Sequence, residues 1–314
     1  GVFMADKQEI LNRIHSGDKE YNSGLADNIQ NARYLGETSI EIVNPDLPRG
    51  GFTHAVIDYD GTISTMRRGW DVVMEKVMVR QILGESPEEA DKDDAQKVTH
   101  RVREYISNTG GVRMIDQMKE LSGMIADFGY VPADRIRTPQ EYKAMVYEKL
   151  GENISRRKEK IKSGELKLGD FVIRGVFPFL KMLKERGIKM YLASGGSQEP
   201  IREDAEFFGF TEFFNGRVYG AVDGVPESSK DMIIAGIMIE NKLEPFQLAS
   251  FGDGTEEIRV GRKLGAVCVG VATDEEKRCG LNTDKRSRLI RMGADIIIPD
   301  FGEADILISW LFNE

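Results

Sequence analysis

Cysteine and histidine are scarce in this chain of 314 residues, and their scarcity excludes several kinds of site. The two cysteines are Cys268 and Cys279, and the three histidines lie far apart at His15, His54 and His100. Without a CxxC pair, the sequence supports neither a disulfide framework nor a cysteine-based zinc site. The scattered histidines argue against a histidine zinc site and against a Ser-His-Asp triad. Because this cysteine usage fits a reducing compartment, we expect a cytoplasmic protein.

Basic residues are fewer than acidic residues, and the sequence has no long apolar run. Lys plus Arg number 43 against 52 Asp plus Glu, and the net charge of −9 argues against a broad nucleic-acid surface. A local basic pocket for a small anion is compatible with that balance. No apolar run approaches the ~20 residues that a membrane span needs, and the first residues lack the pattern of a secretion signal. The common nucleotide-binding loops, GxxxxGK before Ser or Thr and GxGxxG, are absent as well.

The chain does contain enough apolar sequence for a packed core, with 40% hydrophobic and 30% charged residues. Its length predicts two structural units. After about residue 168, apolar strand-like runs alternate with helical segments, which is typical of a parallel sheet with helices on both faces. We predict an α/β, Rossmann-like core from residues 51–66 and 168–314, an inserted all-helical cap at 67–167, and an N-terminal extension at 1–50.

Two carboxylates end the first strand of the predicted core, within the stretch HAVIDYDGTIS. Asp58 and Asp60 follow apolar residues that predict a buried strand, where an acid is costly unless it is paired or bound to a metal. Two other predicted strands end in Ser194 and Asp253, and Lys230 opens a predicted helix. Because the carboxyl ends of parallel strands meet at one edge of a sheet, we expect these side chains to lie together. Such a set suits phosphoryl transfer.

A hard divalent cation, for which we expect Mg²⁺, would offset the cost of gathering these acids. Mg²⁺ takes oxygen ligands and readily keeps waters and a phosphate oxygen in its coordination shell. Asp58 and Asp253 can supply carboxylates, and the backbone carbonyl of Asp60 can supply a third oxygen. Glu257, one helical turn past Asp253, can orient a metal-bound water; the alternative is that it only favours the N-terminus of a helix.

The same residues predict a reaction in two steps. Asp58 would attack phosphorus and form an aspartyl-phosphate. Asp60 would protonate the leaving oxygen and later activate water. Ser194, the backbone N–H groups that follow it from Gly195 onward, and Lys230 would hold the oxygens of the transferred group.

Four further residues are candidates for substrate binding. Thr62 follows the two acids of the first strand, at the same predicted edge of the sheet. Arg67 and Arg68 lie just beyond it, where the chain enters the predicted cap, and Arg113 follows a Gly-Gly pair that predicts a loop. Each arginine is suited to an anionic group of a substrate, and the alternative for each is a solvated surface side chain.

Four ordered segments, DYDGT, YLASGG, SSKDMII and FGDGTEE, resemble the motifs of the haloacid dehalogenase-like superfamily. The resemblance covers about residues 53–310, and the helical insertion is similar to the cap of phosphoglycolate-phosphatase-like and β-phosphoglucomutase-like members. Lys242 is a rival for the motif lysine, but it lies late in its helical stretch. The resemblance implies Asp58 as nucleophile, Asp60 as acid and base, Ser194 and Lys230 as phosphate ligands, and Asp58 and Asp253 on magnesium.

These residues predict a Mg²⁺-dependent phosphatase that hydrolyses a small phosphorylated metabolite, such as a sugar phosphate. A phosphomutase, in which the aspartyl-phosphate passes to a second sugar hydroxyl, remains open. A receiver-like regulatory domain is the alternative from another class, although it would need neither Asp60 in this role nor a long cap. A dehalogenase is disfavoured, because it needs no metal and no acid for the leaving group. We expect no nucleic-acid or membrane partner, and the sequence indicates neither the substrate nor the oligomeric state.

Overall fold

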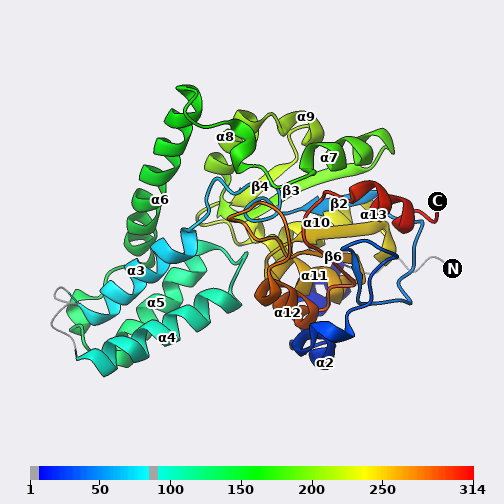
Figure 1. Cartoon of the computed structure of the whole chain (residues 1–314). Coiled ribbons are helices and arrows are strands. Elements are labelled where there is room, and N and C mark those ends of the chain that lie inside the picture. The colour runs from blue at the N-terminus through cyan, green and yellow to red at the C-terminus, as the bar shows by residue number, and fades with distance from the viewer. Residues whose placement is uncertain (1–6, 85–90) are drawn as a thin grey trace. The chain divides into compact units, whose positions relative to one another are not determined.

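The computed structural model describes residues 7–84 and 91–314, and Figure 1 shows its elements. The described chain divides into two compact units. The first, called here the core unit, combines residues up to 65 with residues 168–314. The second, called the helical unit, contains residues 66–167.

A seven-stranded sheet forms the centre of the core unit. Its strands follow the spatial order β1-β7-β6-β5-β2-β3-β4, and all neighbours are parallel except β1 and β7. The predicted α/β class with a parallel, Rossmann-like sheet is therefore confirmed. The strands are β1 (Glu41–Ile42), β2 (His54–Ile57), β3 (Lys189–Ser197), β4 (Val218–Ala221), β5 (Leu248–Gly252), β6 (Val267–Val271) and β7 (Ile296–Ile298).

The central strands β2 and β5 are apolar on both faces. Val56 of β2 lies opposite Tyr191 of β3 on one side and opposite Ser250 of β5 on the other. Every residue of β5 and β6 is buried, and only the first residue of β2 is partly exposed. Continuous apolar runs of this kind, in place of alternation, are what a sheet covered on both sides requires.

Helices cover both faces of this sheet (Figure 1). On one face, Val56 and Leu248 pack against α10 and α11, and on the other face Phe179 of α7 packs against Phe251 of β5. The core unit also contains short 3₁₀ turns at Ile29–Asn31, Leu168–Phe171, Pro226–Ser228 and Pro245–Gln247. Its helices are α1 (Lys7–Ile14), α2 (Ser23–Asp27), α7 (Val176–Glu185), α8 (Gln198–Phe208), α9 (Thr211–Phe214), α10 (Lys230–Asn241), α11 (Thr255–Leu264), α12 (Thr283–Met292) and α13 (Ala304–Leu311).

Helix α12 lies in a charge-rich segment outside the elements expected from the sequence. The side chain of Asn282 caps this helix by accepting hydrogen bonds from the backbone N–H groups of Asp284 (3.1 Å) and Lys285 (3.0 Å). Gly293, in the left-handed region, follows its last turn. The helix carries few apolar residues, and Leu289 is one of those that anchor it in the core. Tertiary packing thus stabilises a helix whose apolar periodicity is weak.

The N-terminal segment, residues 7–50, is part of the core unit. Ile10 and Ile14 of α1 are buried against α10 and α11. Glu41 of β1 accepts two hydrogen bonds from the guanidinium of Arg286 on α12, with both N–O distances at 2.6 Å. Both side chains are only 2% exposed, and Arg286 also donates to the carbonyl of Ala26. The segment therefore packs on α10 and α11 through α1 and is joined to α12 through Glu41 of β1.

All the regular elements described in the helical unit are helices. Met74 and Met78 of α3 and Met118 of α5 are buried in one apolar core. Thr138 and Glu141 form a capping box at the start of α6. The helices are α3 (Trp70–Leu83), α4 (Lys92–Asn108), α5 (Met114–Phe128) and α6 (Pro139–Lys162), with a 3₁₀ turn at Ala133–Arg135.

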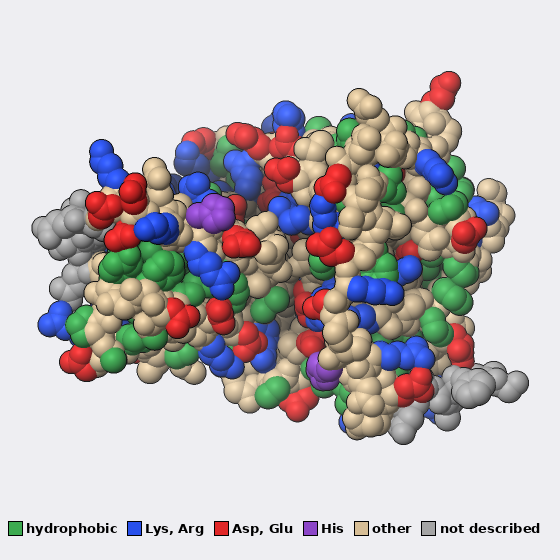
Figure 2. Space-filling model, turned by 90° about the horizontal axis from the view of Figure 1, so that it is seen from below, with side chains coloured by type: hydrophobic (Ala, Val, Ile, Leu, Met, Phe, Trp, Pro, Cys, Tyr) green, Lys and Arg blue, Asp and Glu red, His purple; other side chains and the backbone are tan. Residues whose placement is uncertain are grey.

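Charged side chains of both signs are interspersed on the face of the protein that Figure 2 shows. Hydrophobic side chains lie between them in small groups. In the residues that the structure describes, no helix combines the length and the apolar character that crossing a bilayer demands.

Candidate active site

A lysine lies between two carboxylates at the edge of the sheet where the strands end. Asp58 directly follows β2, Lys230 is the first residue of α10, and Glu257 lies in the first turn of α11. Lys230 Nζ is 2.6 Å from Asp58 Oδ1 and 2.8 Å from Glu257 Oε2, and the three side chains are at most 7% exposed. Burial alone would lower the pKa of Lys230, but the two carboxylates outweigh burial and raise it above its ordinary value. Lys230 therefore carries its positive charge in this site.

Asp253, which follows β5, completes a cluster of three acids. One oxygen from each of Asp58, Asp253 and Glu257 lies within 4.8 Å of the others. Burial raises the pKa of Asp58 well above its ordinary value, although the charge of Lys230 opposes this shift. Acids this close repel one another unless cations join them, and carboxylate oxygens are ligands that Mg²⁺ prefers. The donor set therefore fits the Mg²⁺ ion that the family resemblance implies.

The hydroxyl of Thr62 connects two of these acids. It donates a hydrogen bond to Asp58 Oδ2 (3.1 Å) and accepts one from the backbone N–H of Asp253 (3.0 Å). Thr62 is completely buried, so these contacts hold the two residues in register. Its predicted contact with a substrate stays a prediction.

Two glycines allow the acids to approach the backbone closely. Gly61 has a φ of +74°, and a Cβ placed on it would lie 2.2 Å from Asp253 Oδ2. A Cβ on Gly252 would lie 2.1 Å from Glu257 Oε1. Larger residues would displace both carboxylates, which explains the glycine on either side of the cluster.

Ser194 and Asp60 lie near each other at the same edge. Ser194 Oγ is 3.5 Å from Asp60 Oδ2, the limit of a hydrogen bond. Ser194 and Gly195 belong to β3, whose pairing with β4 shifts register between Ala193 and Ser197. The structure thus brings Asp58, Asp60, Ser194, Lys230, Asp253 and Glu257 to one end of the sheet.

Both oxygens of Glu257 have partners within the protein. Oε1 accepts a hydrogen bond from the backbone N–H of Gly254 (2.7 Å) and so caps α11, while Oε2 contacts Lys230. The neighbouring Glu256 pairs with Arg259 instead (2.7 Å). Glu257 therefore caps the start of α11 and also pairs with Lys230, and its part in metal binding stays a prediction.

Lys285 is a member of this site that the sequence reasoning missed. Its Nζ lies 2.5 Å from Asp253 Oδ2 and 2.5 Å from Glu275 Oε1. Burial would lower its pKa, but these two carboxylates outweigh burial and raise the pKa above its ordinary value. The sequence does carry a signal for α12. Asn282 is a typical residue before the start of a helix, and Gly293 is a typical residue after its end, so the two predict a helix that includes Lys285.

The remaining candidates are Lys242 and three arginines of the helical unit. Lys242 follows the C-terminal end of α10, about 18 Å along the helix from Lys230 at 1.5 Å per residue, and is excluded as the motif lysine. Arg67, Arg68 and Arg113 belong to the helical unit. Arg113 forms an ion pair with Asp116 at 2.6 Å. The roles of the three arginines in substrate binding stay predictions.

Residues 52–265 match the family model described as haloacid dehalogenase-like hydrolase. The match spans more than half of the chain, and the protein therefore belongs to this family. The resemblance drawn from the sequence motifs is confirmed, and so is the prediction that the protein is an enzyme, a hydrolase. No curated protein matches the chain.

Three solved structures are similar to this chain in fold. A predicted phosphatase from Clostridium acetobutylicum has 13% identity and a TM-score of 0.52, and covers 84% of this chain and 100% of its own. A predicted phosphoglycolate phosphatase from Haemophilus somnus has 17% identity and a TM-score of 0.51, with 82% and 96% covered. A β-phosphoglucomutase from Clostridium difficile has 16% identity and a TM-score of 0.52, with 83% and 97% covered. At these identities the likeness establishes the fold.

Proposed function

We propose that this protein is a Mg²⁺-dependent phosphatase that hydrolyses a small phosphorylated metabolite through an aspartyl-phosphate on Asp58. The observation that carries the proposal is the buried Lys230 between Asp58 and Glu257, with Asp253 in the same cluster. A nucleophilic carboxylate, a fixed cation and a set of oxygen ligands are the parts that phosphoryl transfer needs. The similar structures described as phosphatases support the same choice.

The metal would be held by Asp58 and Asp253, by the backbone carbonyl of Asp60, and through a water by Glu257. When bound, Mg²⁺ would neutralise the charge of the acids and of the phosphate, so that an anionic substrate can approach Asp58. The oxygen cluster of Asp58, Asp253 and Glu257 supports this arrangement.

The proposed reaction proceeds in two steps. In the first, an oxygen of Asp58 forms a bond to phosphorus while the bond between phosphorus and the leaving oxygen breaks. Asp60 gives its proton to that leaving oxygen. In the second, Asp60 takes a proton from water, whose oxygen attacks phosphorus and releases inorganic phosphate and the Asp58 carboxylate. The hydroxyl of Ser194 and the ammonium of Lys230 bind the phosphoryl oxygens in both steps.

Chelation and readdition of the metal test the proposed activity. The chelator-treated protein should show no hydrolysis of p-nitrophenyl phosphate, and Mg²⁺ should restore it. An acid-quenched reaction with a labelled substrate should yield a phosphorylated peptide that contains Asp58. Hydrolysis at full rate with the chelator present, or a label on another residue, would contradict the proposal. A panel of phosphorylated metabolites would then identify the substrate class.

Asp60→Asn should slow the reaction according to the leaving group. The variant lacks the proton donor, so alkyl phosphates with poor leaving groups should lose about 10²- to 10⁴-fold in kcat. p-Nitrophenyl phosphate should lose much less, because its leaving group needs little protonation. The ratio of the two rates, measured in wild type and in Asp60→Asn, checks this role. An equal loss on both substrates would point to a structural effect of the change.

Lys285→Met should tighten the binding of Mg²⁺. The ammonium of Lys285 lies next to Asp253 and repels an incoming cation by about 1 kcal/mol, so we expect about fivefold tighter binding without it. Calorimetric titration of Mg²⁺ into chelator-treated protein measures this change. Lys277→Met, in which an exposed lysine of the same region is lost, is the matched control. Unchanged or weaker binding in Lys285→Met would show that Lys285 does not compete with the metal.

We also propose a cytoplasmic location for the protein. Both cysteines are free, and Cys268 is buried. Burial and the charge of Asp295 raise the pKa of the Cys268 thiol well above its ordinary value. A buried, unreactive thiol is common in proteins of a reducing compartment and supports this location.

A further inference from the structure

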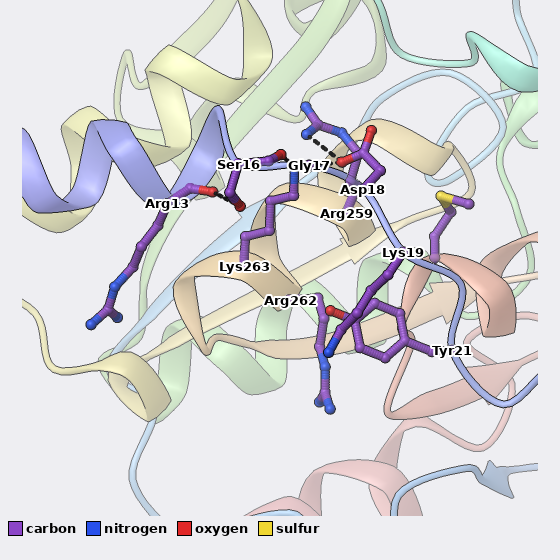
Figure 3. Close-up of a pocket in the computed structure, with 10 residues that line it drawn as sticks. Arg13, Ser16, Gly17, Asp18, Lys19, Tyr21, Arg259, Arg262 and Lys263 are labelled. Atoms are coloured by element: carbon purple, nitrogen blue, oxygen red, sulfur yellow. Dashed lines mark hydrogen bonds and ion pairs between the residues drawn. The ribbon is translucent and has the colours of Figure 1, made fainter.

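A basic pocket lies between the loop that follows α1 and the outer side of α11 (Figure 3). Its volume is about 240 Å³. The first turn of α11 contributes Glu257 to the acid cluster, and the later turns of the same helix supply three basic residues to the pocket. The basic residues of the lining are Arg13, Lys19, Arg259, Arg262 and Lys263.

Basic residues outnumber acidic residues in the lining, and three carboxylates outside it, Glu9, Glu256 and Asp295, pair with Arg13, Arg259 and Arg262. Five basic side chains line the pocket against a single acid, Asp18, whereas the chain as a whole has a net charge of −9. Burial alone would raise the pKa of Asp18, but Lys263 and Arg259 outweigh burial and lower the pKa below its ordinary value. An acid held in its charged form by its neighbours indicates a positive potential at this place.

Two of the basic residues hold the loop that forms one wall. Lys263 donates to the backbone carbonyls of Ile14 (3.3 Å) and Ser16 (2.6 Å) and pairs with Asp18. Arg259 pairs with Asp18 at 3.3 Å and also binds the carbonyl of Ile14. These contacts set the shape of the pocket without the need for a ligand.

Lys19 and Arg262 keep donor groups for a ligand. Lys19 Nζ and Arg262 Cζ each lie 5.0 Å from the centre of the Tyr21 ring, and Figure 3 shows both side chains beside it. Within residues 7–84 and 91–314, Lys19 has no carboxylate partner. Arg262 uses Nη1 for Asp295 (3.1 Å), which leaves its other N–H groups for a further acceptor. Arg13 lies on the opposite side, paired with an exposed glutamate of its own helix.

We propose that this pocket binds a dianionic phosphoryl group, either as inorganic phosphate or as part of a phosphate monoester. The planar guanidinium of Arg262 suits two oxygens of one phosphate, the ammonium of Lys19 adds a second charge, and the Tyr21 hydroxyl adds a neutral donor. None of these three residues belongs to the proposed catalytic site. The site is therefore additional to the proposed phosphatase function and does not depend on it.

Calorimetric titration of the full chain with inorganic phosphate tests this site, with a chelator present. Without a divalent cation, the carboxylates of the catalytic cluster repel phosphate, so the heat reports on the basic pocket. Wild type should bind one phosphate per chain, and added salt should weaken the binding. No heat at millimolar phosphate would overturn the proposal.

Two variants and one control locate the binding. Arg262→Gln should weaken phosphate binding at least about tenfold, since it removes a charged hydrogen-bond donor to the phosphate. Lys19→Gln should weaken it about threefold to tenfold, and it removes no ion pair among the residues that the structure describes. Lys181→Gln, on an exposed lysine of α7 outside the pocket, should bind as wild type does. If Arg262→Gln fails to fold, Lys19→Gln alone decides, and wild-type affinity in Lys19→Gln would overturn the proposal.

A second titration distinguishes the two sources of the phosphoryl group. Glucose 6-phosphate serves as the monoester probe and glucose as its uncharged control. Tighter binding of the monoester than of inorganic phosphate assigns the pocket to a phosphorylated metabolite, and the reverse order assigns it to free phosphate. Equal binding of glucose and glucose 6-phosphate would show that the phosphoryl group is not recognised, and would overturn the proposal.

Discussion

Asp58→Asn is expected to abolish the hydrolysis of p-nitrophenyl phosphate, with kcat reduced by at least about 10⁴-fold, the scale on which loss of a nucleophile acts. An amide oxygen is a much weaker nucleophile than a carboxylate and cannot form the acyl phosphate. The change keeps the shape of the side chain, so Lys230 retains its contact with Glu257 and the fold should persist. The initial rate of p-nitrophenol release at saturating Mg²⁺ measures the effect.

The control for this variant is Asp305→Asn, which removes an exposed carboxylate from α13. It should hydrolyse the substrate as fast as wild type does. Circular dichroism of both variants should match that of wild type. If Asp58→Asn folds and still turns over at the wild-type rate, Asp58 is not the nucleophile and the proposed reaction is wrong.

Arg286→Met is expected to lower the free energy of unfolding of the core unit by about 3–5 kcal/mol. The change leaves Glu41 buried at 2% exposure without the two hydrogen bonds, each at 2.6 Å, that it receives from the guanidinium. It also removes the donor to the carbonyl of Ala26. The N-terminal segment would then lose its main polar connection to α12.

Tryptophan fluorescence can report this loss from the core unit alone. The chain has two tryptophans, Trp70 in the helical unit and Trp310 on α13 of the core unit. In a Trp70→Phe background, urea unfolding followed by fluorescence therefore measures the core unit through Trp310. Because a chain of two units can unfold in two steps, this separation makes the free energy well defined.

A double-mutant cycle separates the ion pair from the packing around it. Glu41→Met together with Arg286→Met should cost less than the sum of the two single changes, because no charge is then left buried. Lys277→Met, at an exposed ion pair with Asp274, should change the free energy by less than about 1 kcal/mol. A loss below about 1 kcal/mol in Arg286→Met would mean that water reaches Glu41 and that the pair does not hold the segment.

Strand ends and helix starts made the catalytic cluster predictable. Asp58, Asp253 and Lys230 each follow or open an element whose apolar pattern is strong, so their place at the sheet edge follows from the parallel order of the strands. Glu257 could be predicted to lie near Asp253, because one helical turn separates them. The hydrogen bond that Glu257 accepts from the Gly254 N–H could not be predicted, since that contact depends on the local backbone.

Apolar periodicity does not reveal Lys285, because α12 carries few apolar residues and is stabilised by its contacts with the N-terminal segment. Arg286, the next residue, faces Glu41, while Lys285 reaches Asp253 and Glu275. The basic pocket arises in the same way. Its wall is a loop after α1, and the two residues of α11 that hold this loop, Arg259 and Lys263, lie more than 200 positions later in the chain.

The sequence by itself determined the α/β class, the family and the residues that meet at the end of the sheet, because short-range patterns and the parallel order of strands are sufficient for these. Tertiary structure alone decided where the N-terminal segment packs, that Lys285 lies beside Asp253, and that basic side chains gather around Tyr21. The physical reason is that these features depend on ion pairs and packing between distant segments, for which local hydrophobic periodicity carries no signal.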